Sequence, residues 1–275
     1  MRNKTDVKIV SAILVLAVLA LGVALYVRFN PAAVPETATE ATATPEPASG
    51  VASDDTSSSP QHPVPAANES SDETVGGAKP AALTQQNMGT EIAARWKSFF
   101  GKEEGQELLR LENFVRHFVL MFENATETKI PAQASIFESV NGDFKTTTLG
   151  DKVQISEQNF RRYDSYAELL KSADLKKLVS FYQRMYPLLQ AGYAEMGRKG
   201  YFNDRVVDVL DQIIGAKDPS LDTSLVIDGG RFVFEDAELE AAPAVQKVLF
   251  RIGPAHSALV KERMKELRAL LVSSQ

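Results

Sequence analysis

The sequence contains no cysteine among its 275 residues. Disulfide bonds, thiolate metal sites and cysteine nucleophiles are therefore excluded. Histidine is scarce as well, since the three histidines, His62, His117 and His256, lie far apart in the sequence. A zinc site usually takes several ligands at short, regular spacing, and this distribution offers no such pattern. We expect neither a metal nor any other cofactor.

Motifs for phosphate binding and for serine hydrolysis are also missing. The chain has no glycine-rich phosphate loop and no serine nucleophile elbow. The net charge of −6 comes mainly from an acidic stretch before residue 90, and the residues that follow are nearly balanced in charge. A nearly balanced domain lacks the basic surface that nucleic-acid binding requires. We therefore expect no nucleic-acid partner, and we assign no catalytic residue.

A long uncharged hydrophobic run occupies the N-terminus. Residues 9–27, IVSAILVLAVLALGVALYV, approach the ~20 apolar residues that a membrane-spanning helix needs. Three basic residues precede the run and an acidic stretch follows it, so the positive-inside rule places residues 1–8 in the cytoplasm. We predict an uncleaved, single-pass signal anchor in the inner membrane, with the C-terminal domain in the periplasm. Cleavage near Ala24 or Ala33 is the alternative.

Residues 28–90 are rich in proline, alanine, threonine and serine and are acidic. They contain few large apolar side chains, so they bury too little surface to offset the entropy lost on ordering. We predict a disordered linker that tethers a folded domain to the membrane. A plain spacer is one interpretation. The other is that one of its proline motifs is a ligand for a partner.

Residues 91–275 are predicted to form a single, mainly α-helical domain with a long central helix and short β-hairpins. Glycine-containing turns at Asn141-Gly142, Gly150-Asp151 and Asp228-Gly229-Gly230 predict the hairpins. Thr90, Ser172 and Asn203 are the expected N-caps of three helices. Apolar residues recur at helical spacing in the segments 90–101, 105–123, 166–170, 172–197, 204–214, 243–252 and 254–271.

Five segments occur in a familiar order. They are NFRRYDSY, YQRMYPLLQAGYAEMG, GYFNDRVVDVLDQII, FEDAELE and QKVLFRIGP, the last followed by a basic amphipathic helix. Over about residues 105–272 this order and spacing resembles the bacterial domain-of-unknown-function family 3014. The resemblance implies one N-terminal membrane segment and a low-complexity linker. It implies no activity and no catalytic residues, because the family is uncharacterised.

Tyrosines and charged residues concentrate between residues 159 and 215, and this concentration is the candidate site. Tyrosine faces with carboxylate and guanidinium groups suit a cleft that binds a sugar or a peptide. The same residue types also join helix ends in purely structural networks, so both interpretations remain open. The candidate residues are Arg162, Tyr163, Asp164, Tyr193, Glu195, Tyr201, Asn203, Asp204 and Arg205.

Two functions follow as hypotheses. The first is a non-enzymatic, membrane-anchored envelope protein whose helical domain binds another envelope protein or cell-wall material. The second is a peptidoglycan-active hydrolase that uses paired carboxylates, with Asp164 or Glu195 facing Asp204 or Asp208. Glycoside cleavage needs two such carboxyl groups about 5 to 10 Å apart.

Overall fold

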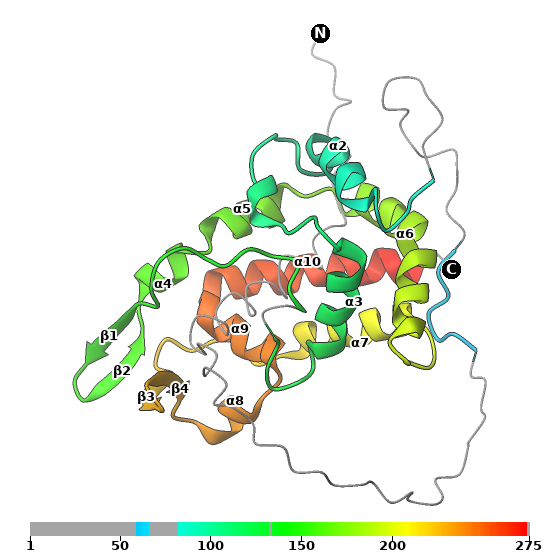
Figure 1. Ribbon diagram of the computed structural model, residues 1–275. Helices are drawn as coiled ribbons and strands as arrows, with labels where there is room; N and C mark the ends of the chain where they lie inside the picture. The colour runs from blue at the N-terminus through cyan, green and yellow to red at the C-terminus, as the bar shows by residue number, and fades with distance from the viewer. Residues whose placement is uncertain (1–58, 66–81, 132–133, 274–275) are drawn as a thin grey trace, which may run out of the picture.

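The computed structural model describes residues 59–65, 82–131 and 134–273. They form a mainly helical domain that carries two small antiparallel hairpins (Figure 1). Within these ranges no helix combines the length and the apolar character needed to cross a membrane. The predicted membrane segment, residues 9–27, and the N-terminal residues 1–8 lie outside the described residues.

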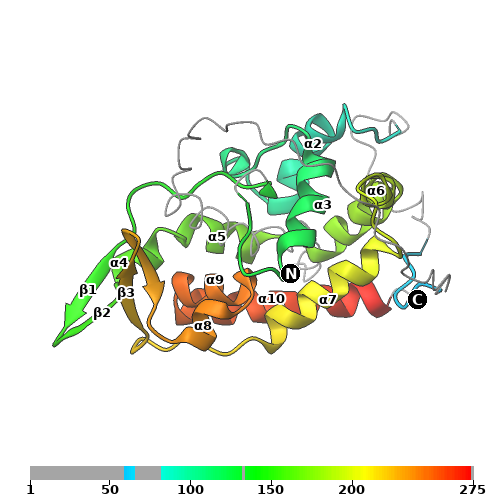
Figure 2. The ribbon, with the colours of Figure 1, turned by 60° about the horizontal axis from the view of Figure 1, so that its bottom comes forward.

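The C-terminal helix α10 (Pro254–Ser273) runs across the middle of the helical body in Figure 1 and along its lower side in Figure 2. It contacts α5 (Asp164–Ser172), α6 (Leu175–Glu195), α7 (Phe202–Gly215) and α9 (Ala244–Ile252). The longest helix, α6, contacts α10, α7 and two helices from earlier in the chain. Those two are α2 (Met88–Phe100) and α3 (Phe114–Asn124).

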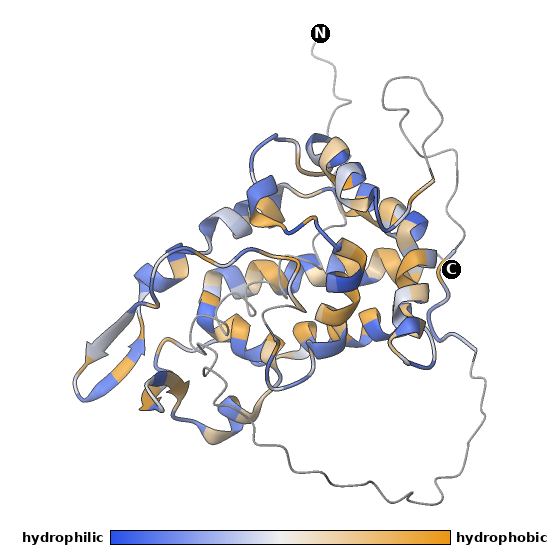
Figure 3. Ribbon diagram, in the orientation of Figure 1, coloured by the Kyte–Doolittle hydropathy of each residue, from blue (hydrophilic) through white to orange (hydrophobic). Residues whose placement is uncertain are grey.

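The helices enclose one large hydrophobic core, and Figure 3 shows how hydrophobic and hydrophilic residues alternate along the helix ribbons. Trp96 is fully buried in this core, and its indole N–H donates to the Glu104 carbonyl at 3.0 Å. On α6, Leu178, Met185 and Leu189 are buried, whereas Pro187 is exposed. The sequence therefore predicted correctly both the wide apolar face of the central helix and its solvent-exposed edge. A proline has no backbone N–H to donate to the carbonyl four residues earlier, and on a solvent-facing edge water can take the place of that donor.

A four-stranded antiparallel sheet stands at one end of the helical body (Figure 2). Its strands are β1 (Thr146–Leu149), β2 (Lys152–Ile155), β3 (Ser224–Asp228) and β4 (Arg231–Phe234), in that order. The two hairpins confirm the turns predicted at residues 150–151 and 228–230. The pairing of β2 with β3, through Val153 opposite Leu225, joins them into one sheet. Two short helices, α4 (Glu157–Arg161) and α8 (Ala237–Ala241), flank these strands in the sequence.

The predicted helix over residues 105–123 is only half correct, because α3 begins at Phe114. Residues Gln106–Leu108 form one 3₁₀ turn, and Leu109 then pairs with Phe137 as an isolated bridge. Gly105 has φ +98°, a backbone conformation that α-helix formation cannot use. The chain around Phe137 forms only this single bridge. The hairpin predicted at Asn141-Gly142 is therefore wrong, since the described residues before Thr146 contain no strand.

The three predicted N-caps are wrong in detail. Helix α2 begins two residues before Thr90, and the cap of α6 is Asp174, whose carboxylate accepts from the Lys177 amide at 2.9 Å. Helix α7 begins at Phe202, so Asn203 lies within its first turn. Each true boundary falls within a few residues of the predicted one, which is the usual precision of capping signals.

Two stretches within the range 28–90, predicted to be disordered, make defined contacts. Residues 59–65 lie against α7, and Thr84 and Asn87 exchange hydrogen bonds just before α2. Val64 and Leu83 pack against the core as partly buried residues. Hydrogen bonds to the backbone and two apolar contacts hold these stretches. The average composition of a segment does not reveal such individual contacts. The other residues between 28 and 81 lie outside the described part.

Candidate functional site

The structure divides the candidate residues between two places. Arg162, Tyr163 and Asp164 lie at the corner between α4 and α5, whereas the other candidates lie around the end of α6 and the start of α7. Among those others, Glu195 is exposed at the last position of α6. The polar cluster that the sequence suggested is therefore not one cleft.

At the α4–α5 corner the polar side chains bind the protein's own backbone. The Arg162 guanidinium donates to the carbonyls of Gly142 at 2.7 Å and Asn141 at 3.1 Å. It also donates to the carboxamide oxygen of Asn159 at 2.8 Å. Asn159 is fully buried, and its amide nitrogen donates to the Arg251 carbonyl at 2.9 Å. This network joins three distant segments, so its evident role is structural.

Tyr163 and Asp164 fit the same structural interpretation. Tyr163 is completely buried, its hydroxyl has no hydrogen-bond partner in the structure, and burial raises its pKa. The carboxylate of Asp164 lies 3.1 Å from the imidazole Nε2 of His256 on α10. Neither side chain borders the pocket described next.

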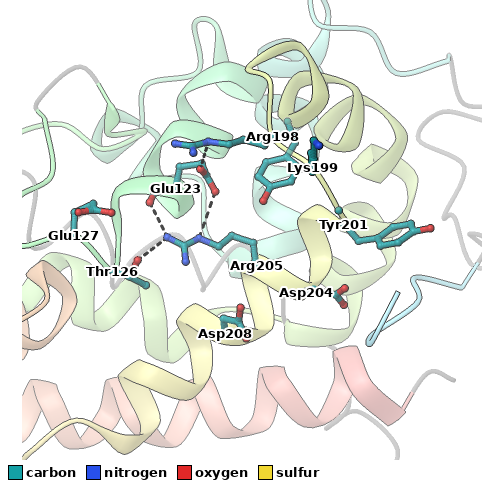
Figure 4. A pocket seen from close by; sticks show the side chains of 11 residues that line it. Glu123, Thr126, Glu127, Arg198, Lys199, Tyr201, Asp204, Arg205 and Asp208 are labelled. Atoms are coloured by element: carbon teal, nitrogen blue, oxygen red, sulfur yellow. Dashed lines mark hydrogen bonds and ion pairs between the residues drawn. The ribbon is translucent and has the colours of Figure 1, made fainter. Parts of the chain in front are cut away.

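The second group borders an open pocket of about 540 Å³ (Figure 4). We call it the α7 pocket. Tyr193, Tyr201, Asp204 and Arg205 contribute to its lining, as the sequence suggested, and they come from α6, from α7 and from the connection between them. The complete lining is Glu123, Thr126, Glu127, Tyr193, Arg198, Lys199, Gly200, Tyr201, Asp204, Arg205 and Asp208.

Glu123 organises the charges on one side of the α7 pocket (Figure 4). Its carboxylate lies 2.6 Å from the Arg198 Nε and 3.4 Å from the Arg205 Nε, and its side chain is only 10% exposed. Arg205 also donates to the Glu123 carbonyl at 2.7 Å and to the Thr126 hydroxyl at 2.6 Å. Since Glu123 lies at the end of α3, these bonds fix the edge of the pocket to the helical body.

Asp204 and Tyr201 face the other way. Both side chains point away from the Glu123–Arg205 pair in Figure 4, and Asp204 points toward residues 59–65, which we call the docked segment. The carboxylate of Asp204 accepts hydrogen bonds from the backbone amides of Gln61 at 3.1 Å and His62 at 2.7 Å. Ion pairs therefore hold one side of the α7 pocket, whereas Asp204 on the other side bonds a peptide from the same chain that does not line the pocket.

Asn203 lies beneath the docked segment and is almost fully buried. Its carboxamide oxygen accepts from the Tyr182 hydroxyl at 2.9 Å, and its amide nitrogen donates to the His62 carbonyl at 2.8 Å. Tyr182 is buried on α6, and burial raises the pKa of its hydroxyl. Its proton is therefore retained, and Asn203 is held in one orientation.

The family described as protein of unknown function (DUF3014) matches residues 114–268. The chain belongs to this family. No curated protein and no solved structure matches the chain. The DUF3014 region runs from the start of α3 into α10, so it contains the α4–α5 corner and the whole α7 pocket. The docked segment and α2 precede it.

The carboxylate pairs considered for a hydrolase do not share the α7 pocket. Asp204 and Asp208 line it, but Asp164 and Glu195 do not. The carboxyl group whose pKa is raised by burial is that of Asp174, which caps α6 and bonds a backbone amide. Among the described residues, no group of three or more metal-binding side chains is close enough to hold a metal ion.

The sequence did not predict several residues that line the α7 pocket. Glu123 and Thr126 are distant in sequence from the tyrosine-rich stretch, and no local pattern connects them to Arg205. Arg198 and Lys199 could have been predicted from the sequence, because they lie in the short connection between two predicted helices. Loops that join rigid helices often carry binding residues, and that signal would have found them.

Proposed function

We propose that this DUF3014 chain is a non-enzymatic, membrane-anchored envelope protein whose helical domain binds another envelope protein or cell-wall material. In this proposal residues 9–27 cross the lipid bilayer of the inner membrane once, and the domain lies in the periplasm. The support for the anchor is the uncharged length of this run and the basic residues before it.

The observation that carries the binding proposal is the α7 pocket. It is open to solvent, and charges of both signs from α3, α7 and the connection after α6 border it. Arg198 and Arg205 are oriented by Glu123 before any ligand arrives, which lowers the entropy cost of binding. Lys199 and Asp208 are exposed at the rim.

Such a lining favours a polar ligand that carries both charges, such as a peptide. A purely anionic ligand would meet Glu123, Glu127 and Asp208, and a purely cationic one would meet three basic side chains. A peptide with alternating charge satisfies both sets. Exposed envelope proteins and the peptide part of the cell wall both offer this chemistry.

Photo-crosslinking in living cells tests this proposal on the full chain. A photoreactive amino acid replaces Tyr201, and the adducts are analysed by mass spectrometry. We expect adducts with a defined envelope protein or with wall peptide. Lys199→Ala should weaken them several-fold, because Lys199 lines the pocket.

Lys171→Ala is the matched control, because Lys171 is an exposed lysine on α5 that does not border the pocket. It should leave the adducts unchanged. Adducts between copies of the chain alone, or adducts insensitive to Lys199→Ala, would contradict a binding role. Release of soluble fragments from peptidoglycan, abolished by Asp208→Asn, would instead support the hydrolase hypothesis.

A further inference from the structure

The docked segment, SPQHPVP, has a pattern that suits its contacts with α7. Pro60 and Pro63 lack backbone N–H groups, so the amides of Gln61 and His62 form an isolated pair between them. The two oxygens of Asp204 each accept one of these amides. Asp204 lies in the first turn of α7, where the helix dipole stabilises its negative charge.

The remaining contacts show that several groups of the folded domain hold the docked segment. The Asn203 amide donates to the His62 carbonyl, and the buried Tyr182 hydroxyl holds the other end of the Asn203 carboxamide. Two residues further on, Val64 packs against the hydrophobic core. Helix α7 thus supplies two acceptors and one oriented donor, and the hydrophobic core supplies an apolar contact, to a single stretch of peptide.

The start of α7 contacts mainly the backbone of the docked segment and only few of its side chains. Gln61 and Pro63 are exposed, and every hydrogen bond between α7 and the docked segment uses the peptide backbone. Proline preorganises an extended peptide and lowers its ordering cost, as in other recognition of proline-rich segments. A different peptide with two amides between prolines and an aliphatic residue after them would make the same contacts.

We propose that the start of α7 is a binding site for an extended Pro-x-x-Pro peptide, followed by an aliphatic residue, from another polypeptide, and that residues 59–65 occupy this site in cis. This inference rests on the proposed binding function and specifies the chemistry of the partner. Asn203 and Asp204 belong to the matched DUF3014 region, whereas the docked segment lies outside it.

The docked segment then acts as a competitor. A ligand that belongs to the same chain as its site reaches an effective concentration on the order of 1 mM. If the docked segment itself has an intrinsic Kd of about 0.1 mM for the site, a partner peptide would bind roughly tenfold more weakly while that competitor is present. Removing the competitor should therefore expose the site.

A peptide-binding assay with the full chain tests this inference. The probe is a fluorescently labelled synthetic peptide, SPQHPVP, and the reporter is fluorescence anisotropy. In one variant the residues from Pro60 to Val64 are replaced by glycine and serine. We expect this variant to bind the probe saturably and at least about tenfold more tightly than the unaltered chain. A probe with serine at the position of Val64 should bind several-fold more weakly.

Two isosteric substitutions in the segment-replaced chain distinguish loss of the binding site from loss of the fold. Asp204→Asn replaces one acceptor by an amide that opposes a backbone N–H, so it should weaken probe binding at least tenfold. Asp211→Asn, about two turns later on α7, should leave binding unchanged, because Asp211 is exposed and borders neither the docked segment nor the α7 pocket. Circular dichroism checks that both variants are folded.

Absence of saturable binding to the segment-replaced chain, or binding that Asp204→Asn does not weaken, overturns the inference. Since the cross-linking test depends on Lys199 and needs no proline-rich partner, the two proposals can fail separately. Loss of peptide binding with retained Lys199-dependent adducts would remove this inference and keep the broader proposal.

Discussion

At the α4–α5 corner, arginine and asparagine side chains bind the chain's own backbone, whereas at the start of α7 the same residue types border an open pocket and a docked peptide. Arg162 and Asn159 donate to carbonyls of two distant chain segments, at residues 141–142 and at Arg251. Arg205 is tied to Glu123, but its neighbours Lys199 and Asp208 remain exposed. Arginine and asparagine thus occur in both places. Exposure to solvent is what distinguishes the candidate binding site from the structural network.

The largest difference is expected from the two glycines Gly253 and Gly197. Both have positive φ, +86° and +73°, but an added Cβ at Gly253 would lie 2.5 Å from the Phe160 ring next to the corner, and at Gly197 it would meet nothing within 4 Å. Gly253→Ala should lower the free energy of unfolding by about 2–5 kcal/mol, and Gly197→Ala by about 1–2 kcal/mol. Denaturant unfolding measures both. Equal losses would show that the corner is not tightly packed.

Arg162→Ala should have the next largest effect. It removes charge-assisted bonds to Gly142, Asn141 and Asn159, which should cost about 2–3 kcal/mol of unfolding free energy. Arg161 is the control, because it is highly exposed and lies 3.8 Å from Glu157 as its ion-pair partner. Arg161→Ala should cost less than about 0.5 kcal/mol. If the two alanine variants unfolded alike, the structural role of the corner would be refuted.

Tyr182→Phe probes the base of the docked segment's site. The substitution leaves the buried Asn203 carboxamide oxygen without its donor, so we expect a loss of about 1–2 kcal/mol in unfolding free energy. Asn203 would also lose its fixed orientation, so labelled SPQHPVP should bind the segment-replaced chain several-fold more weakly. An unchanged affinity would mean that Tyr182 does not orient the site.

Tyr163→Phe should have the smallest effect at neutral pH, within about 0.5 kcal/mol, because the Tyr163 hydroxyl has no hydrogen-bond partner in the structure. Alkaline unfolding distinguishes the variant. Burial raises the pKa of Tyr163 above its unfolded value of about 10, so its contribution is complete below pH 10 and is lost as the pH rises further. The variant should therefore lose less stability above pH 10 than the unaltered chain. A parallel decline would contradict this assignment and point instead to other buried tyrosines, such as Tyr166, whose pKa is raised to about 12, or Tyr182, whose pKa is also raised by burial.

Sequence periodicity predicted the helical class and the buried face of α6 because apolar spacing reports directly on burial. Glycine turns located both hairpins, since Gly150, Gly229 and Gly230 all adopt positive φ. The failures were non-local. No spacing rule pairs β2 with β3, or predicts that Leu109 bridges to Phe137 instead of continuing a helix.

The candidate site shows the same limit. The tyrosine-rich stretch predicted Tyr193, Tyr201, Asp204 and Arg205 together, because one loop and two adjoining helices carry them. It also included Arg162 and Tyr163, since composition cannot tell a solvent-exposed arginine from one that binds backbone carbonyls. Glu123 and the docked segment were missed because they reach α7 from distant parts of the chain.

Amide hydrogen exchange at Gln61 and His62 in the full chain tests the central claim most directly. If the docked segment occupies the start of α7, both amides are protected, they lose that protection in Asp204→Asn, and they keep it in Asp211→Asn. Exchange of both amides in the unaltered chain at the rate of the free peptide SPQHPVP would contradict the account.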